Sequence, residues 1–291
     1  MSRSQDTLGA GAEHTRDDTA VPMTGGYLFI SQINFQNCKA ATDLPRWRLA
    51  AQHTDIHKYT DIALIQEPWL IQGQIGGLDL KQGSIFHEDL ETGSRACVYT
   101  KRGLGATKLA EFCTRDQAAV LFPAVVGGRG ANLVVCSTYL PHDSEGPRPR
   151  GNSESWWSLY CKVKGLQLVI GCDANAHHIV WGSSDINKRG EALLEDLATT
   201  NLEILNRGSD PTFVTSRRQE VLDITLGSVQ DWRVEDEITL SDHRLITFKL
   251  KTDADLRASE TYRNPRATCW PQYRESLEGE LRGRRVRPRT T

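Results

Sequence analysis

Short apolar runs alternate with polar loops and helical stretches between Tyr27 and about Leu250. Eight runs predict strands: YLFISQIN, IALIQE, ACVYT, AVLFPAVV, ANLVVCSTYL, LQLVIGCD, VLDITLG and RLITFKL. Several are almost continuously apolar, which is typical of strands covered on both faces of their sheet. Helical patterns fall at about 43–58, 153–164 and 189–200. The segments 83–89, 141–152 and 207–219 are rich in Gly, Pro, Ser or Asp and predict loops.

The ratio of strands to helices predicts the fold class. Many strands with few helices indicate an α/β fold in which two packed, mainly antiparallel sheets are flanked by helices. We expect this domain over residues 26–251. Residues 1–25 are polar and aperiodic and predict a disordered leader. Residues 252–291 are also polar, end with five arginines in the last ten positions, and predict a linker or tail.

Composition and charge narrow the function classes. The 291 residues carry a formal net charge of −2, so nucleic acid would have to bind at a local basic patch. Seven cysteines without a CxxC pair argue against zinc knuckles and redox motifs and fit a reducing compartment. No apolar run approaches about 18 residues and no targeting pattern begins the chain, so we expect neither a membrane span nor secretion.

Single polar side chains stand at the ends of the predicted strands. Glu67, for example, follows the apolar run IALIQ and precedes Pro68. The residues placed in this way are Asn34, Glu67, Tyr139, Asp173, Asp223 and the pair Asp242–His243. Polar groups on the rim of a rigid sheet are the usual construction of a catalytic cleft.

The spacing of these residues indicates their chemistry. Asp173 and Asn175 are two residues apart, so in an extended chain their side chains face the same way. A carboxylate there can orient or deprotonate a water, and a neutral amide can hold that water or a phosphoryl oxygen. Adjacent Asp242 and His243 face opposite ways, so the imidazole needs a carboxylate from another strand, for which Asp223 is the obvious candidate.

A carboxylate far from these groups in sequence suits a hard divalent cation. Glu67 is therefore predicted to bind Mg²⁺. His243 and Asn34 would then stabilise a pentacoordinate phosphate. The set as a whole predicts metal-assisted phosphodiester hydrolysis.

Each motif also has a simpler interpretation. A glutamate before proline is commonly structural or solvated, DAN is commonly a turn, and SDH before a strand is commonly a cap or turn. His177 and His178 look like a metal pair, but no third ligand stands at metal spacing, which favours packing or loop hydrogen bonds. The joint occurrence of the polar groups, each at a strand end, favours the catalytic interpretation.

The motifs QIN, LIQEPW, STYLPHDS, GCDANAHHIVWGS, PTFVTSRRQEVLDITLGS and LSDHRLITFKL resemble the endonuclease/exonuclease/phosphatase superfamily over roughly residues 27–250. More narrowly, they resemble the apurinic-like endonuclease domain of insect non-LTR retrotransposons of the jockey and ribosomal-DNA-inserting kinds. The patterns NAHHxxWGS…NxRG and DITL are specific to that branch. YRNPRATCWPQYRESL also resembles the segment that leads towards reverse transcriptase in those polyproteins.

This resemblance implies a four-layered α/β sandwich of the DNase I-like kind and one catalytic Mg²⁺ or Mn²⁺. By position it implies catalytic roles for Asp173, Asn175, His243, Asp223, Tyr139 and Asn34, and metal binding by Glu67 and Asp242. Tyr139 would contact the scissile phosphate, Asp223 would orient His243, and Asp242 would support the metal. The nick in such elements leaves a 3′-hydroxyl that primes reverse transcription.

Contacts to double-stranded DNA are expected beside this site. Thr212, in PTF, matches a position that lines the DNA cleft in the family. Arg217, Arg218, Lys188 and Arg189 are predicted to form a local basic rim, although four scattered cations are also an ordinary surface. Action on chromosomal DNA implies a nuclear location, and otherwise a cytoplasmic one is expected, with no membrane partner.

Three alternatives stay open on the sequence: a phosphatase of the same superfamily, an abasic-site endonuclease, and an inactive nucleic-acid-binding remnant. A basic motif for a sugar- or lipid-phosphate pocket is missing, which disfavours the first, and the branch-specific motifs disfavour the second. The chain also has no YADD- or FADD-type motif. We therefore expect an endonuclease truncated before the reverse transcriptase, which would meet element RNA only through that missing portion.

Overall fold

The computed structural model describes residues 26–43, 60–78, 83–88, 93–124, 131–142, 159–160, 162–163 and 165–252. The expected leader, the tail beyond Thr252, nearly all of the helix expected at 43–58 and most of the segments 141–152 and 153–164 lie outside the described residues. Within the described part, no helix is long and apolar enough to cross a membrane.

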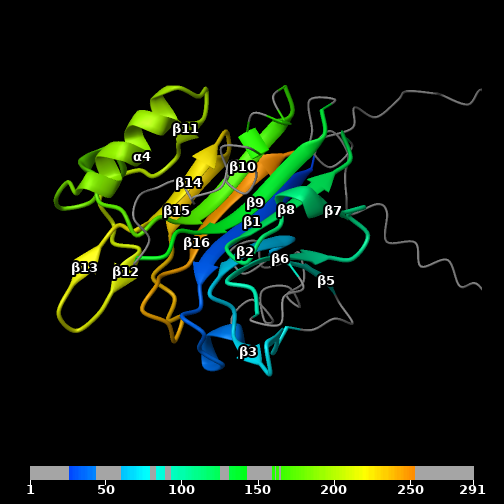
Figure 1. Cartoon of the computed structure of the whole chain (residues 1–291), viewed down its shortest axis with the longest axis horizontal. Helices are drawn as coiled ribbons and strands as arrows, with labels where there is room; N and C mark the ends of the chain where they lie inside the picture. Colours follow the sequence, from blue (N-terminus) through cyan, green and yellow to red (C-terminus); the bar gives the residue numbers. More distant parts are fainter. Residues whose placement is uncertain are drawn as a thin grey trace, which may run out of the picture.

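Two six-stranded sheets dominate the described part of the chain (Figure 1). The first has the order β15-β16-β1-β2-β6-β5, with bounds Gln230–Val234, Ile246–Lys251, Tyr27–Asn34, Ile62–Gln66, Ala96–Lys101 and Gly83–Phe86. The second has the order β11-β14-β10-β9-β8-β7, with bounds Glu203–Ile204, Asp223–Gly227, Gln167–Asp173, Leu133–Tyr139, Gln117–Phe122 and Thr107–Lys108. Among these strands only β1–β2 and β9–β10 pair in parallel.

Smaller elements flank the sheets. Two hairpins pair β3 with β4 and β12 with β13, with bounds Leu70–Ile71, Gln74–Ile75, Phe213–Val214 and Gln219–Glu220. The helix α4 spans Lys188–Ala198, and the 3-10 turns η1, η2 and η3 span Ala40–Thr42, Ala110–Phe112 and Ile179–Trp181. The expected α/β sandwich of two mainly antiparallel sheets is confirmed.

Alternation along the strands divides the apolar residues into three layers. Ile62 and Leu64 of β2 face a core that also contains Val135 and Val169 of the second sheet. The intervening Ala63, with Ile65 of the same strand and Tyr99 of β6, belongs to a cluster on the outer face of the first sheet. The outer face of the second sheet packs against α4. These layers explain the continuous apolar runs, because both faces of each central strand are covered.

The helix α4 begins where the sequence predicts a helix start. The Asn187 side chain accepts a hydrogen bond from Gly190 N at 2.7 Å, which caps the first turn. Leu193 and Leu197 are buried against Ile170 in the outer layer of the second sheet. The amphipathic stripe therefore covers this sheet on the side away from the inter-sheet core.

The eight predicted strands are confirmed, with shifts of a few residues at their ends. The loop expected at 83–89 was wrong in part, because β5 occupies its first half, and β12 lies inside the loop expected at 207–219. The sequence analysis also missed β15, in which QDWRV alternates between exposed and half-buried positions. All three are short or lie at a sheet edge, where one-sided burial leaves little apolar signal.

Polar contacts join the two sheets near the carboxyl ends of β1, β2 and β10. The Gln32 side chain of β1 donates to the carbonyls of Cys172 and Ile224 at 3.4 and 3.3 Å and accepts from the Thr225 hydroxyl at 2.8 Å. The Gln66 side chain of β2 likewise donates to Gly171 O at 3.1 Å. Since buried amides need partners, these contacts fix how one sheet sits on the other.

Substituting Gly171 tests this inter-sheet contact. A Cβ at Gly171 would lie 2.8 Å from both Gln32 Oε1 and Leu64 Cδ1, and Gln32 is held by its own hydrogen bonds. Gly171→Ala should therefore lower the free energy of unfolding by about 1–3 kcal/mol in urea denaturation. Combining it with Gln32→Ala should cost less than the sum of the single changes, and strict additivity would contradict the account.

Candidate active site

Strand pairing brings the predicted polar groups to one end of the two sheets. Asn34 ends β1, and its parallel neighbour β2 is followed directly by Glu67. Tyr139 and Asp173 end the parallel strands β9 and β10 and stand opposite each other. Asp223 begins β14 and is paired with Asp173. Groups more than 180 residues apart in the chain (34 to 223) thus share one edge.

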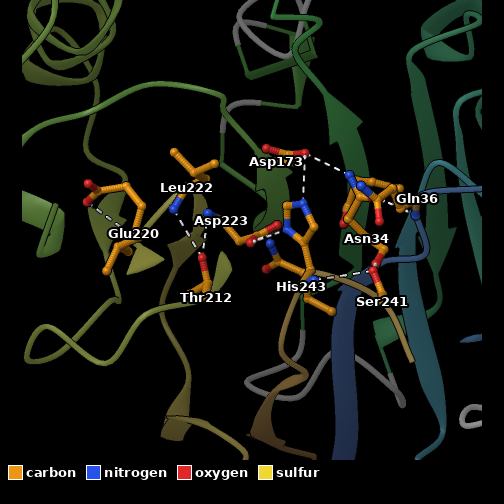
Figure 2. A network of polar contacts seen from close by, with 12 residues as sticks. Asn34, Gln36, Asp173, Thr212, Glu220, Leu222, Asp223, Ser241 and His243 are labelled. Atoms are coloured by element: carbon orange, nitrogen blue, oxygen red, sulfur yellow. Dashed lines mark hydrogen bonds and ion pairs between the residues drawn. The ribbon is translucent and has the colours of Figure 1, made fainter. Parts of the chain in front are cut away.

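Asn34 connects the carboxylates of the two sheets. Its side chain is fully buried, and its Nδ2 donates to Asp173 Oδ2 at 2.7 Å and to Glu67 Oε2 at 3.0 Å. Its Oδ1 accepts from Gln36 N at 2.6 Å. Figure 2 shows Asn34 pointing from the first sheet towards Asp173. The amide thereby holds two like charges in fixed positions.

His243 lies between two carboxylates of the second sheet. Its Nδ1 is 2.7 Å from Asp223 Oδ2, and its Nε2 is 4.0 Å from Asp173 Oδ2 (Figure 2). The edge of the ring packs on Phe213, with centroids 5.1 Å apart. Asp223 therefore fixes the orientation of the imidazole and turns Nε2 towards Asp173.

Crowded charges shift the pKa values in this space. Burial, with the Asp223 carboxylate nearby, raises the pKa of Asp173 to about 7. Burial alone would lower the pKa of His243, but Asp223, assisted by Asp173 and Glu67, raises it to about 9. Burial and the carboxylates of Glu67 and Asp173 also hold the pKa of Tyr139 well above its usual value. At neutral pH the imidazole is thus a cation and Tyr139 keeps its proton.

Thr212 does not lie where the sequence analysis placed it. Its side chain is fully buried, and its hydroxyl oxygen accepts from Leu222 N and Asp223 N, each at 3.0 Å (Figure 2). No surface of the Thr212 side chain is exposed, so the predicted contact to DNA does not fit this placement as a direct side-chain contact. The residue instead fixes the backbone that carries Asp223.

Two of the predicted residues adopt left-handed backbone conformations. Glu67 has φ 43° and Asn175 has φ 44°. The chain leaves β10 at Asp173, so simple alternation does not govern Asn175. Its Nδ2 donates to Leu140 O at 3.0 Å, which leaves the side-chain oxygen as the group that can accept from a water. Such conformations cost about 1–3 kcal/mol each and are concentrated at functional sites.

The polar groups open into a cleft of about 250 Å³. It is lined by Gln36, Glu67, Tyr139, His142, Asp173, Asn175, His177, Asn187, Phe213, Arg218, Leu222 and His243. Asp242 does not line it: its carboxylate accepts from Gln36 Nε2 at 3.0 Å and reaches the cleft only through that residue. The expectation that Asp242 supports a metal directly does not fit this placement.

Several of these cleft residues escaped the sequence analysis. Gln36 and His142 lie two and three residues after the ends of β1 and β9. This position close behind a strand end is the sequence feature that could have predicted their place in the cleft. Ser241 also serves the site, because its hydroxyl donates to Asn34 O at 2.8 Å and accepts from His243 N at 3.2 Å. Its place in the SDH motif could have indicated this role.

The four predicted DNA-contacting cations do not act alike. Arg189 donates to Pro141 O at 2.7 Å and Leu140 O at 3.2 Å, which ties its guanidinium to the loop after β9. Lys188 and Arg217 are exposed and do not line the cleft. Arg218 does line it. The rim expected from the sequence is therefore reduced to one cation on the cleft wall among these four.

His177 and His178 have different surroundings. His178 Nδ1 accepts from Val180 N at 3.1 Å and so caps η3, as a loop hydrogen bond would. His177 Nδ1 is 2.6 Å from Asp185 Oδ1, and its ring lies about 3.1 Å from the Arg218 guanidinium. His177, Asp185 and Glu220 have ligand atoms close together, but the Arg218 cation already lies beside them.

The acidic side of the cleft fits a hard divalent cation. Glu67 and Asp173 offer carboxylate oxygens on either side of Asn34, the donor type that Mg²⁺ and Mn²⁺ prefer. Burial and the Asp223 carboxylate, which raise the pKa of Asp173, also favour a cation near its ionised form. Asp173, Asp223 and His243 form a second close group, but the imidazole already pairs there with Asp223.

Known proteins are similar to this chain in sequence and architecture. Residues 133–247 match the family model described as endonuclease-reverse transcriptase. The chain is 27% identical over 213 residues to the RNA-directed DNA polymerase from mobile element jockey of Drosophila funebris, a match that covers 71% of this chain. It spans only 22% of the length of that relative.

Solved structures agree with this match. The endonuclease domain of TRAS1, a telomere-specific non-LTR retrotransposon, superposes with a TM-score of 0.62 and 25% identity, over 78% of this chain and 99% of that domain. The AP endonuclease LMAP from Leishmania major, at 12% identity and a TM-score of 0.56 over 77% of this chain and 88% of its own, shares the fold. The chain is therefore similar in sequence and fold to the endonuclease domains of non-LTR retrotransposons.

Proposed function

We propose that residues 26–251 form a divalent-metal-dependent DNA endonuclease that cuts one phosphodiester and leaves a 3′-hydroxyl for primed reverse transcription. The observation that carries this proposal is the connected series of contacts from Glu67 through Asn34 to Asp173, with the His243–Asp223 pair beside it. A carboxylate with a pKa near neutrality next to an imidazolium is suited to acid–base chemistry on a phosphate.

The proposed step is attack of a water on the scissile phosphorus. Asp173, with a pKa of about 7, orients the water and takes its proton, and the Asn175 oxygen accepts the second hydrogen bond. The water oxygen bonds to phosphorus, the P–O3′ bond breaks, and the 3′-oxygen leaves with a proton from solvent. The products are a 3′-hydroxyl and a 5′-phosphate.

Charge that develops on the phosphoryl oxygens is met by donors of this chain. His243 stays protonated because of Asp223 and presents Nε2 on the side of Asp173. Tyr139 retains its hydroxyl proton and donates a hydrogen bond to the scissile phosphate. Preorganised donors of this kind stabilise the transition state without rearranging. Glu67 would hold the cation, which would supply positive charge to offset the charge that develops on the phosphate.

Arg218 is proposed to bind a phosphate next to the scissile one. It is the one lysine or arginine among the described residues that line the cleft. Its guanidinium lies about 3.1 Å from His177 Nε2 and 3.9 Å from Glu220 Oε2, which restricts its position. The described cleft lining therefore presents a carboxylate at Glu67 and a cation at Arg218. A phosphodiester chain, with charges on both sides of the cut, matches this polarity better than a single phosphate monoester.

Nicking of supercoiled plasmid tests the catalytic assignment. The wild-type protein should nick in Mg²⁺ or Mn²⁺, stop in EDTA, and leave ends that a DNA polymerase extends without phosphatase treatment. Asp173→Asn and His243→Gln should each slow nicking by roughly 10²–10⁴-fold, since each removes a proton-transfer or charge-stabilising group. Asp231→Asn, an exposed carboxylate on β15, is the matched control. Wild-type rates in both site variants would contradict the assignment.

Replacement of Arg218 tests the phosphate contact. Arg218→Ala should raise KM for plasmid with little change in kcat and reduce the salt slope of binding by about 1. Arg217→Ala removes an exposed cation from the same turn but from outside the cleft, and it should change KM much less. Equal effects of the two variants would favour a diffuse charge effect over a specific contact.

The pH dependence of stability tests the electrostatics without any substrate. Asp173 has a pKa raised from 3.8 to about 7, and His243 has one raised from 6.5 to about 9. Both groups bind protons more tightly in the folded state, so stability falls as pH rises through these values. In EDTA the thermal midpoint should drop by several degrees between about pH 6 and 9, and Asp223→Asn should flatten the upper part of this range. Mg²⁺ should raise the thermal midpoint more at pH 9 than at pH 6. A midpoint that rises with pH in EDTA would contradict the raised pKa values of Asp173 and His243.

A further inference from the structure

Two aliphatic side chains project from the loop between β15 and β16. Ile238 is 82% exposed and Leu240 is 62% exposed, whereas Thr239 between them is 5% exposed. In Figure 1 this loop extends from the same lower edge of the molecule as the β3–β4 hairpin. The chain thus turns a polar residue inward and two large apolar residues outward, the reverse of the usual distribution.

Hydrogen bonds attach this loop to the active site. The Thr239 hydroxyl donates to His243 O at 2.6 Å and accepts from Ser241 N at 3.3 Å. The Ser241 hydroxyl donates to Asn34 O at 2.8 Å. Leu240 is therefore displayed by two residues that contact the backbone of His243 and Asn34. Its position relative to the cleft is fixed rather than left to a free loop.

The backbone of Leu240 is strained. Its φ of 58° lies in the left-handed region, which costs a residue with a branched side chain about 1–2 kcal/mol. Glycine would relieve that strain and would also remove an exposed apolar surface. A bulky aliphatic side chain is thus held outward in this conformation three residues before His243, which favours a role in contacting a ligand.

The loop carries four acidic residues, Glu235, Asp236, Glu237 and Asp242, and basic side chains lie beside two of them. Two acidic residues near its start have basic partners, since Glu235 accepts from Arg233 at 2.9 Å and Asp236 lies 3.7 Å from Arg244. The cleft that contains His243, three residues beyond Leu240, is polar and matches a phosphodiester. Next to a bound phosphodiester the apolar surfaces within reach are the faces of the bases.

We propose that Leu240, with Ile238 beside it, is an apolar wedge that enters duplex DNA next to the scissile phosphate and unstacks a base step. This inference rests on the proposed endonuclease function and adds a substrate preference to it. Leucine and isoleucine side chains open base steps in this way in DNA-bending proteins. Because pyrimidine–purine steps unstack most readily, the domain should prefer to cut beside them.

A paired and a pre-opened substrate test the wedge. Single-turnover nicking is measured on a duplex oligonucleotide with a mapped cut site and on the same duplex with a mismatch at the adjacent step. Leu240→Gly should nick the paired duplex roughly tenfold more slowly and the mismatched duplex at about the wild-type rate, since the mismatch is already partly unstacked. Its thermal midpoint should equal or exceed that of the wild type, because glycine tolerates the left-handed conformation.

A fluorescent base separates the wedge from catalysis. With 2-aminopurine at the step beside the cut site and Ca²⁺ in place of Mg²⁺, wild-type binding should raise the emission and Leu240→Gly should not. Leu166→Ala, which removes an exposed aliphatic beside the opposite end of β10, should match the wild type in every assay.

Wild-type nicking of both duplexes by the Ile238→Ala/Leu240→Gly double variant would overturn the wedge. An equal loss on both duplexes would overturn it too, because it would place the effect on His243. A protein–protein role for these side chains would appear as a change in oligomeric state without a change in 2-aminopurine emission, and would also overturn it. Failure of the wild-type protein to nick any duplex would instead refute the proposed function. The two failures can be distinguished, because the 2-aminopurine emission reports unstacking without cleavage.

Discussion

The site depends on one electrostatic constraint: two buried carboxylates, Asp173 and Asp223, share a space with a single imidazole. Each is almost fully buried, so their repulsion is weakly screened, and the His243 cation between them is the compensating charge. This arrangement gives the imidazole a raised pKa and Asp173 a pKa near neutrality. The base, Asp173, and the charge stabiliser, His243, thus arise from the same crowding of charges.

The sheets make that crowding possible. Parallel pairing places Asn34 beside Glu67 and Tyr139 beside Asp173, while the buried Gln32 and its partners fix one sheet on the other. An isolated strand could not hold like charges at these distances, because they would separate. The cost of burying them is offset by the inter-sheet core of aliphatic side chains beneath. Fold and chemistry are therefore coupled through the strand ends.

Much of this could be predicted from sequence, for identifiable reasons. Strands such as β1 and β10 are continuous apolar runs that end in one polar residue, and this pattern located both the sheets and the cleft. Alternation of side chains excluded Asp242 as the partner of His243 and left Asp223 as the candidate, and the family resemblance implied the same role. Alternation could not reveal that Asn175 has φ 44°, or that Thr212 and Arg189 turn to backbone groups. Those placements depend on contacts between distant segments.

The most direct test of the electrostatic account is an NMR titration of the His243 imidazole in the metal-free protein. The account predicts that this histidine titrates near pH 9, with Nδ1 hydrogen-bonded, and that Asp223→Asn moves its pKa well downward. An imidazole that titrates near 6.5 in the wild-type protein, or one indifferent to the loss of the Asp223 charge, would contradict it.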